Sequence, residues 1–156
     1  ILSGRTHDKN IAQIAAWLQV QGIRMKEARV VADETPAIVE AVNALRERYD
    51  YVFTTGGIGP THDDITVDAI AEALGVEVVV HPEARAILEG YYETRGGLTD
   101  ARLRMARVPA GASLIPNRYT GAPGIRSTDA EELTACTRVL AEGLEAMDRP
   151  VIAGGI

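Results

Sequence analysis

The chain has 156 residues, 46% of them hydrophobic and 24% charged, which is the size and composition of one folded domain with a buried core. Its net charge of −6 gives no global basic field, so we expect no nucleic-acid partner. The one cysteine, Cys136, excludes an internal disulfide and a cysteine-based metal cage. No run approaches the roughly 18–20 apolar residues that span a bilayer, and the sequence opens on no leader-like segment. We therefore expect a cytoplasmic protein without membrane contact.

The first half of the chain alternates between helical and strand-like patterns. Apolar residues spaced i, i+3, i+4 and i+7 predict a first helix, which Asp8 or Asn10 can cap and Gly22 can end. Pro36, which follows two acidic residues, is typical of the first turn of a second helix. The predicted elements are helices at residues 10–20 and 35–48 and strands at 23–31 and 49–55.

The second half continues the alternation. Gly75 is placed to end one helix, and Pro82 begins the next at a position where its missing N–H costs nothing. The predicted elements are helices at residues 64–74, 82 to near 96, 99–107 and 129–147, and strands at 76–80, 112–115 and 150–153. This order predicts an α/β fold in which helices cover both faces of a mainly parallel sheet, joined by right-handed crossovers.

Two places are unusual for a complete domain. The chain opens on a loop at residues 1–4, although such a loop would normally leave the end of a strand. Later, Gly124 passes abruptly to Ile125. We therefore expect residues 1–124 to form one domain whose first strand is missing. Residues 125–156 are expected to form a small helix-and-strand element that follows a missing segment.

A glycine turn is the strongest candidate site. The predicted strand at 49–55 ends in Thr55, and Gly56, Gly57 and Gly59 follow within four positions, shortly before a helix. Glycines allow positive φ and close approach of a ligand, and exposed N–H groups beside a helix N-terminus bind anions. In open α/β sheets ligands bind at the carboxyl ends of strands. The turn is neither a dinucleotide fingerprint nor a P-loop, because no Lys-Ser/Thr pair follows. The alternative is a tight strand-to-helix turn, capped by Asp64, in which Thr66 satisfies a backbone group.

Two carboxylates, Asp63 and Asp64, follow the glycine turn. A bare carboxylate would repel a phosphate, so acidic residues beside a phosphate site usually act through a divalent cation. Both are therefore candidate metal ligands and catalytic residues. Either could instead be a simple helix cap, because caps and ligands both favour Asp.

Two further polar segments could face the glycine turn. The loop before the first helix carries Ser3, Gly4, Asp8 and Asn10, which could recognise a ring or a ribose, although plain capping of the helix is the alternative. Near the predicted helix at 99–107, Arg104 could grip a phosphate with its guanidinium fork, although a solvated basic face is more common.

Together these motifs resemble the molybdopterin-binding domain shared by the Mog and MoaB proteins, the gephyrin-like proteins and the amino-terminal part of CinA. The segment at 54–59 with Asp64-Ile65-Thr66 looks like the glycine-and-Asp signature of that family, and residues 60–66 are closest to its CinA-like branch. The opening loop at 2–10 and Ala122-Pro123-Gly124 also resemble that branch. The resemblance implies a three-layer α/β/α fold and a molybdopterin or related nucleotide ligand, with the three glycines at its phosphate and Asp8 nearby.

The resemblance leaves several activities open. Mog-type members adenylylate molybdopterin, but their motif has Arg where this chain has Asp63. CinA-like members are associated with hydrolysis of the pyrophosphate of ADP-ribose. On that expectation Asp63 and Asp64 hold Mg²⁺, Mn²⁺ or Co²⁺, the glycine amides stabilise developing charge and Arg104 clamps phosphate. The alternative is a non-catalytic module that binds or carries the molybdenum cofactor. We also expect a small phosphorylated ligand as the partner and a homo-oligomer.

Overall fold

The computed structural model describes residue 2 and residues 7–117, 122–127 and 153–155. Three sequence predictions lie outside these residues: the helix at 129–147 with Cys136, and the candidate site residues Ser3 and Gly4. Of the strand predicted at 150–153, only Ala153 is described, and it begins β6. The helices are α1 (Asn10–Val20), α2 (Thr35–Arg46), α3 (Thr66–Leu74), α4 (Pro82–Tyr92), α5 (Asp100–Leu103) and the short 3₁₀ helix η1 (Arg104–Ala106). The strands are β1 (Phe53–Thr55), β2 (Val78–Val80), β3 (Arg107–Pro109), β4 (Ser113–Ile115), β5 (Gly124–Arg126) and β6 (Ala153–Gly155).

Helix α1 has the bounds predicted from the sequence, and both of its ends have a local cause. The Asp8 carboxylate accepts a hydrogen bond from the Ile11 N–H at 2.8 Å, which satisfies one donor of the first turn. At the other end, Gly22 has φ +76°, and the next amide, that of Ile23, donates to Leu18 O at 2.9 Å. A left-handed glycine with this backbone bond is a common way to end a helix.

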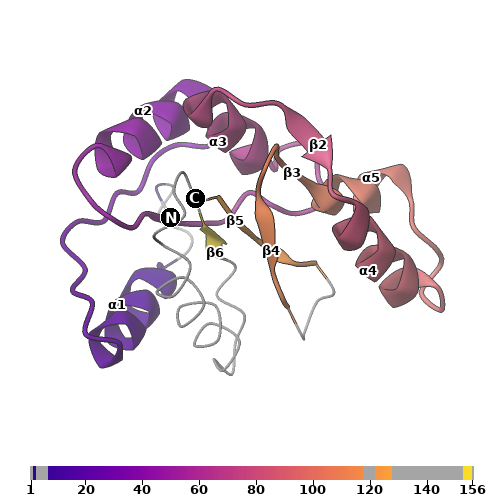
Figure 1. Cartoon of the computed structure of the whole chain (residues 1–156), viewed down its shortest axis with the longest axis horizontal. Coiled ribbons are helices and arrows are strands. Elements are labelled where there is room, and N and C mark those ends of the chain that lie inside the picture. The colour runs from indigo at the N-terminus through magenta and orange to yellow at the C-terminus, as the bar shows by residue number, and fades with distance from the viewer. Residues whose placement is uncertain (1, 3–6, 118–121, 128–152, 156) are drawn as a thin grey trace.

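Helices α2 and α3 pack side by side across the top of the molecule in Figure 1. The interface is a buried apolar cluster of Ile38, Val42, Ala69, Ile70 and Ala73. Three alanines or valines in this contact keep the side chains short, which lets the two helices approach closely. As predicted, Pro36 lies in the first turn of α2, and Gly75 ends α3 with φ +69°.

The strands form two small sheets, and their pairing differs from the predicted mainly parallel sheet. One sheet has the order β1-β6-β5-β4, and the other pairs β2 with β3. Within the part of the chain that is described, β1–β6, β2–β3 and β4–β5 are antiparallel, and only β5–β6 is parallel. The alternation of helices and strands therefore predicted most of the helices and several strands, whereas the direction of pairing depends on non-local backbone contacts that this alternation does not fix.

The later strands also refine the predicted division of the chain. Strand β5 runs across the expected boundary between Gly124 and Ile125 and pairs with both β4 and β6. The position of that boundary stays a prediction. The predicted helix at 99–107 is divided into α5 and η1, and Arg107 already begins β3. Thr99 caps α5 by accepting the Arg102 N–H at 3.3 Å.

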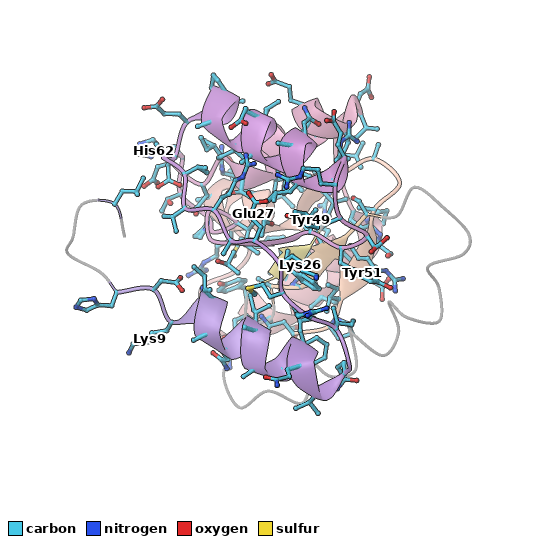
Figure 2. The ribbon with its side chains drawn as sticks, turned by 90° about the vertical axis from the view of Figure 1, so that its left-hand side faces the viewer. Lys9, Lys26, Glu27, Tyr49, Tyr51 and His62 are labelled. Carbon is cyan, nitrogen blue, oxygen red and sulfur yellow. The ribbon has the colours of Figure 1, made fainter. Side chains whose placement is uncertain are left out.

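Residues 23–31 are extended but are not paired as the predicted strand among the described residues. The segment is instead anchored by side chains, because Glu27 accepts hydrogen bonds from Arg29 at 2.8 Å, Tyr49 at 2.8 Å and Arg48 at 3.3 Å. Figure 2 shows Glu27 and Tyr49 together between α1 and α2. Half-buried and exposed side chains alternate only over residues 23–28, and residues 28–31 are all exposed. Among the described residues, no helix is long and apolar enough to cross a membrane.

Candidate functional site

The turn after β1 holds two left-handed glycines that are needed for different reasons. Gly56 has φ +94° and Gly57 has φ +66°, a region that side chains with a Cβ rarely adopt. A Cβ on Gly56 would meet nothing within 4 Å, so the space beside this residue is open. A Cβ on Gly57 would lie 2.1 Å from the Thr66 hydroxyl oxygen. Gly57 therefore allows α3 to pack against the turn, whereas Gly56 leaves the backbone accessible from outside.

The start of α3 is held to the turn by Thr66. Its side chain is buried, and its amide donates to Gly57 O at 3.1 Å. Thr66 was predicted to contact the ligand, and here it lies on the buried side of the turn and holds it through this hydrogen bond. Thr55, the last residue of β1, is exposed at the opening of the turn. Thr55, Gly57 and Thr66 thus belong to the same turn, as the sequence indicated. Their contact with a ligand stays a prediction.

Asp64 organises the second part of the turn, from Gly59 to the start of α3. Its Oδ2 accepts hydrogen bonds from the Thr61 amide at 2.9 Å and from the Thr61 hydroxyl at 2.5 Å. The Gly59 amide also donates to this carboxylate, and a Cβ on Gly59 would lie only 2.7 Å from Oδ2. The Gly59 N–H is thus directed at Asp64. Among the described residues Gly56, Gly57 and Ile58 donate no backbone hydrogen bond, so their amides are the candidate outward donors of the turn, and Gly56 is the exposed residue of the three.

Both acidic residues remain ionised at neutral pH. Partial burial alone would raise the pKa of Asp64, but the hydrogen bonds from Thr61 and from the Gly59 amide outweigh it and hold the pKa below its usual value. The pKa of Asp63 is also lowered, chiefly by the neighbouring Thr61 side chain and then by a hydrogen bond from its own backbone. The turn therefore presents two negative charges next to the glycine amides.

The two carboxylates do not by themselves make a cation site. Asp64 already accepts hydrogen bonds from Thr61 and Gly59, and Asp63 is exposed. Over the described ranges, no group of three or more His, Cys, Asp or Glu residues could hold a metal ion. Divalent cations in proteins usually take more oxygen ligands than two carboxylates that already accept hydrogen bonds supply. The arrangement therefore fits a hydrogen-bonded turn better than a resident metal.

The remaining predicted site residues lie on other elements. Asp8 caps α1, as described above, and Asn10 is the first residue of that helix. Figure 2 shows Lys9 and His62, on the loops that lead into α1 and α3, at the same end of the molecule. Arg104 belongs to η1, whose contacts run to α4 and α5, and its Nε is buried without a hydrogen-bond partner among the residues that are placed. Its neighbour in sequence, Arg107, forms an ion pair with Asp68 of α3.

Thr61 is the residue of the site that the sequence reasoning missed. It donates twice to Asp64, from its amide and its hydroxyl, and so closes the loop that precedes α3. The signal was present, because a Thr followed three residues later by an acidic residue before an apolar run is typical of a capping arrangement at a helix start. Here the acidic side chain accepts from the threonine amide, as in a capping box, and it also accepts from the threonine hydroxyl.

Comparison with known proteins identifies the family of this chain. Residues 1–149 match a family described as "Probable molybdopterin binding domain". A protein of Pyrobaculum aerophilum is 46% identical over 126 residues, which are 80% of this chain and 47% of that protein. A protein of Geotalea uraniireducens named CinA-like protein is 38% identical over 129 residues, 82% of this chain and 31% of the relative. The crystal structure of the protein CinA from Thermoplasma acidophilum, titled as having unknown function, aligns with a TM-score of 0.74 at 35% identity, over 80% of this chain and 73% of that one.

The chain therefore belongs to the molybdopterin-binding domain family. Within it, the similarity to CinA-like proteins in both sequence and structure confirms the branch that the turn and the acidic pair indicated. The α/β class is confirmed with it. The chain spans about half the length of the Pyrobaculum relative and less than a third of the CinA-like protein. What the longer proteins do comes to this chain only as a proposal.

Proposed function

We propose that this domain binds a phosphorylated pterin or a related nucleotide, with the phosphate against the amides of Gly56 and Gly57. The observation that carries the proposal is at Gly56, where a left-handed backbone is exposed and the space beside its Cα is open. Successive backbone N–H groups in a turn can point to one side, which forms a small anion-binding hollow. Membership in the molybdopterin-binding domain family supports a pterin phosphate, and the three-layer arrangement stays part of this proposal.

The charges of the turn make the proposal specific. Asp63 and Asp64 are both ionised, so they oppose a bare phosphate placed on the adjacent amides. The ligand must therefore gain more from the two amides and from its ring or ribose than it loses to this repulsion. Asp63 is the exposed carboxylate of the pair. Its removal therefore weakens the repulsion of the phosphate while the hydrogen bonds of Asp64 in the turn remain.

A pair of matched glycine variants tests ligand binding at the turn. Gly56→Ala places a methyl group in the open space where the phosphate is proposed to lie. Gly75→Ala is the control, because it places a methyl group in open space at the end of α3, away from the proposed site, where φ is +69° and nothing lies within 4 Å. Both variants place a Cβ on a residue with positive φ, which costs on the order of 1–2 kcal/mol of backbone strain. Calorimetric titration with ADP-ribose, AMP and a phosphorylated pterin should show binding weakened at least about tenfold by Gly56→Ala and unchanged by Gly75→Ala. Equal affinities of the two variants would refute the site.

Hydrolysis of ADP-ribose and adenylyl transfer to molybdopterin stay narrower predictions. The turn contributes amides for developing charge and an ionised Asp64, and either reaction would use both. Turnover of ADP-ribose with Mg²⁺, Mn²⁺ or Co²⁺ separates an enzyme from a binding module. If Asp64 takes part, Asp64→Ala must lose turnover by more than its loss of ADP-ribose affinity. If wild type binds ADP-ribose in calorimetry and turns over none of it with any of the three cations, the domain is a carrier or binding module.

A further inference from the structure

Strand β2 has an apolar free edge on the side of the molecule away from α1. Within the described residues its one strand partner is β3, and β2 consists of three consecutive valines. Val79 is 39% exposed and Val80 is 43% exposed, and Ile87 of the following helix is 40% exposed. Natural sheets usually protect an open edge with lysine, proline or an inward charge, because an unprotected edge pairs with other chains. None of these occurs within Val78–Val80.

The backbone of β2 determines which residues could pair at this edge. The β2–β3 ladder is extended at both ends by backbone bonds, from Ala110 N to Glu77 O at 2.7 Å and from His81 N to Ala106 O at 2.8 Å. Hydrogen-bonded positions alternate along an antiparallel ladder. Residues 77, 79 and 81 therefore direct their N–H and C=O toward β3, and Val78 and Val80 direct theirs outward.

We propose that two copies of this chain associate through β2, paired antiparallel about a two-fold axis at Val79. In this register, Val78 of one copy and Val80 of the other exchange both backbone hydrogen bonds, and the two-fold axis repeats the pair. Val79 meets its own equivalent, and Glu77 stands opposite His81 of the second copy on both sides. Opposed residues that do not share ladder bonds come closest, with Cα atoms about 4.5 Å apart, so the Glu77 carboxylate and the His81 imidazole of the second copy are in contact range.

Other registers that use the same outward groups are less favourable. An axis at residue 77 brings the two Glu77 carboxylates together, and like charges directly opposite one another destabilise a sheet. An axis at Val80 places Val78 opposite Pro82, which has no N–H to donate. An axis at Val78 places Glu77 against an apolar Val79 and leaves His81 without a carboxylate. The axis at Val79 avoids the Glu77 repulsion and the missing N–H of Pro82 and gives each Glu77 a polar partner, and the resulting interface is isologous, as expected for a two-fold dimer.

Sedimentation equilibrium of the full chain over a range of concentrations tests the interface. Wild type should dimerise, and Val79→Lys should weaken the dimer at least about tenfold, because it places two ammonium groups on the axis. Val20→Lys is the matched control, since Val20 is 82% exposed on α1, and it should leave the dimer unchanged. A wild type that is monomeric at all concentrations would overturn the proposal. So would a dimer that Val79→Lys does not weaken.

A charge exchange tests the register itself. Glu77→Lys should weaken the dimer, and the double variant Glu77→Lys with His81→Glu should restore it to within about threefold of wild type. Because His81 precedes α4, circular dichroism of each variant shows first whether it folds. If the double variant is unfolded, Glu77→Gln replaces it and should weaken the dimer less than Glu77→Lys does. A dimer that is insensitive to every change at Glu77 would overturn the register. The interface is independent of the proposed ligand site, so either can fail alone.

Discussion

The two left-handed glycines of the turn allow a sharp test of what the site's backbone requires. In Gly56→Ala, the added methyl group meets no protein atom within 4 Å, so only the strain of φ +94° opposes it. We expect a cost of about 1–2 kcal/mol in the free energy of unfolding. In Gly57→Ala, the strain is similar, but the methyl would lie 2.1 Å from the Thr66 hydroxyl oxygen and 3.1 Å from its Cβ. Overpacking of this kind costs about a further 1–3 kcal/mol.

Urea unfolding followed by circular dichroism measures both costs, and Gly57→Ala should be less stable than Gly56→Ala by about 1–3 kcal/mol. A double-mutant cycle identifies the cause. If the Thr66 hydroxyl is the obstacle, then Thr66→Ala should relieve part of the cost of Gly57→Ala, and the two changes should be non-additive by about 1 kcal/mol or more. Equal stability of the two glycine variants, or strict additivity in the cycle, would show that α3 does not pack against Gly57 as described.

Three further predictions concern charge. Because hydrogen bonds hold the pKa of Asp64 below its usual value, this carboxylate stabilises the fold above about pH 4, and the contribution is lost as the pH falls through the lowered pKa. Asp64→Asn should therefore lower stability at neutral pH and flatten its loss below pH 4 in acid unfolding, and an unchanged acid profile would contradict this. A hydrogen bond to Glu27 raises the pKa of Tyr49 above 10.0, so this bond stabilises the fold below pH 10 and the contribution is lost as the pH rises through the raised pKa. Glu27→Gln should therefore lower the pKa of Tyr49 in an NMR titration. Finally, Asp63→Asn should strengthen binding of ADP-ribose in metal-free buffer several-fold by removing a repelling charge, whereas weaker binding would favour a cation-mediated contact.

The local elements were predictable because their causes lie within a few residues of sequence. Helix α1 is the clearest case, since the Asp8 cap and the left-handed Gly22 fix both of its ends. The start of α3 was predicted two residues too early, at Asp64, because the carboxylate that was expected to begin the helix instead accepts from Thr61 in the preceding loop. A single carboxylate near a helix start does not show which of these two arrangements it forms.

The pairing of strands and the roles of the site residues were less accessible. Residues 23–31 were predicted as a strand, but side-chain contacts of Glu27 anchor them, and the local sequence does not show whether such a segment pairs with another strand. Strand β3 was missed because Arg107 reads as the end of a helix, while its partner β2 is distant in sequence. Among the site residues, the sequence placed Gly59 with Gly56 and Gly57, yet its amide is directed at Asp64. Spacing predicts that a turn needs glycine; it does not indicate which amides face outward.

The most direct test of the central proposal follows the glycine amides themselves. In a ¹⁵N-labelled sample titrated with ADP-ribose or a phosphorylated pterin, the amide signals of Gly56 and Gly57 should shift downfield with saturation, as expected for N–H groups that donate to a phosphate oxygen. The amide of Gly75, which donates to Glu72 O at the end of α3, should not move. Saturable binding that leaves both turn glycines unshifted would contradict the proposal, because the ligand would then lie elsewhere.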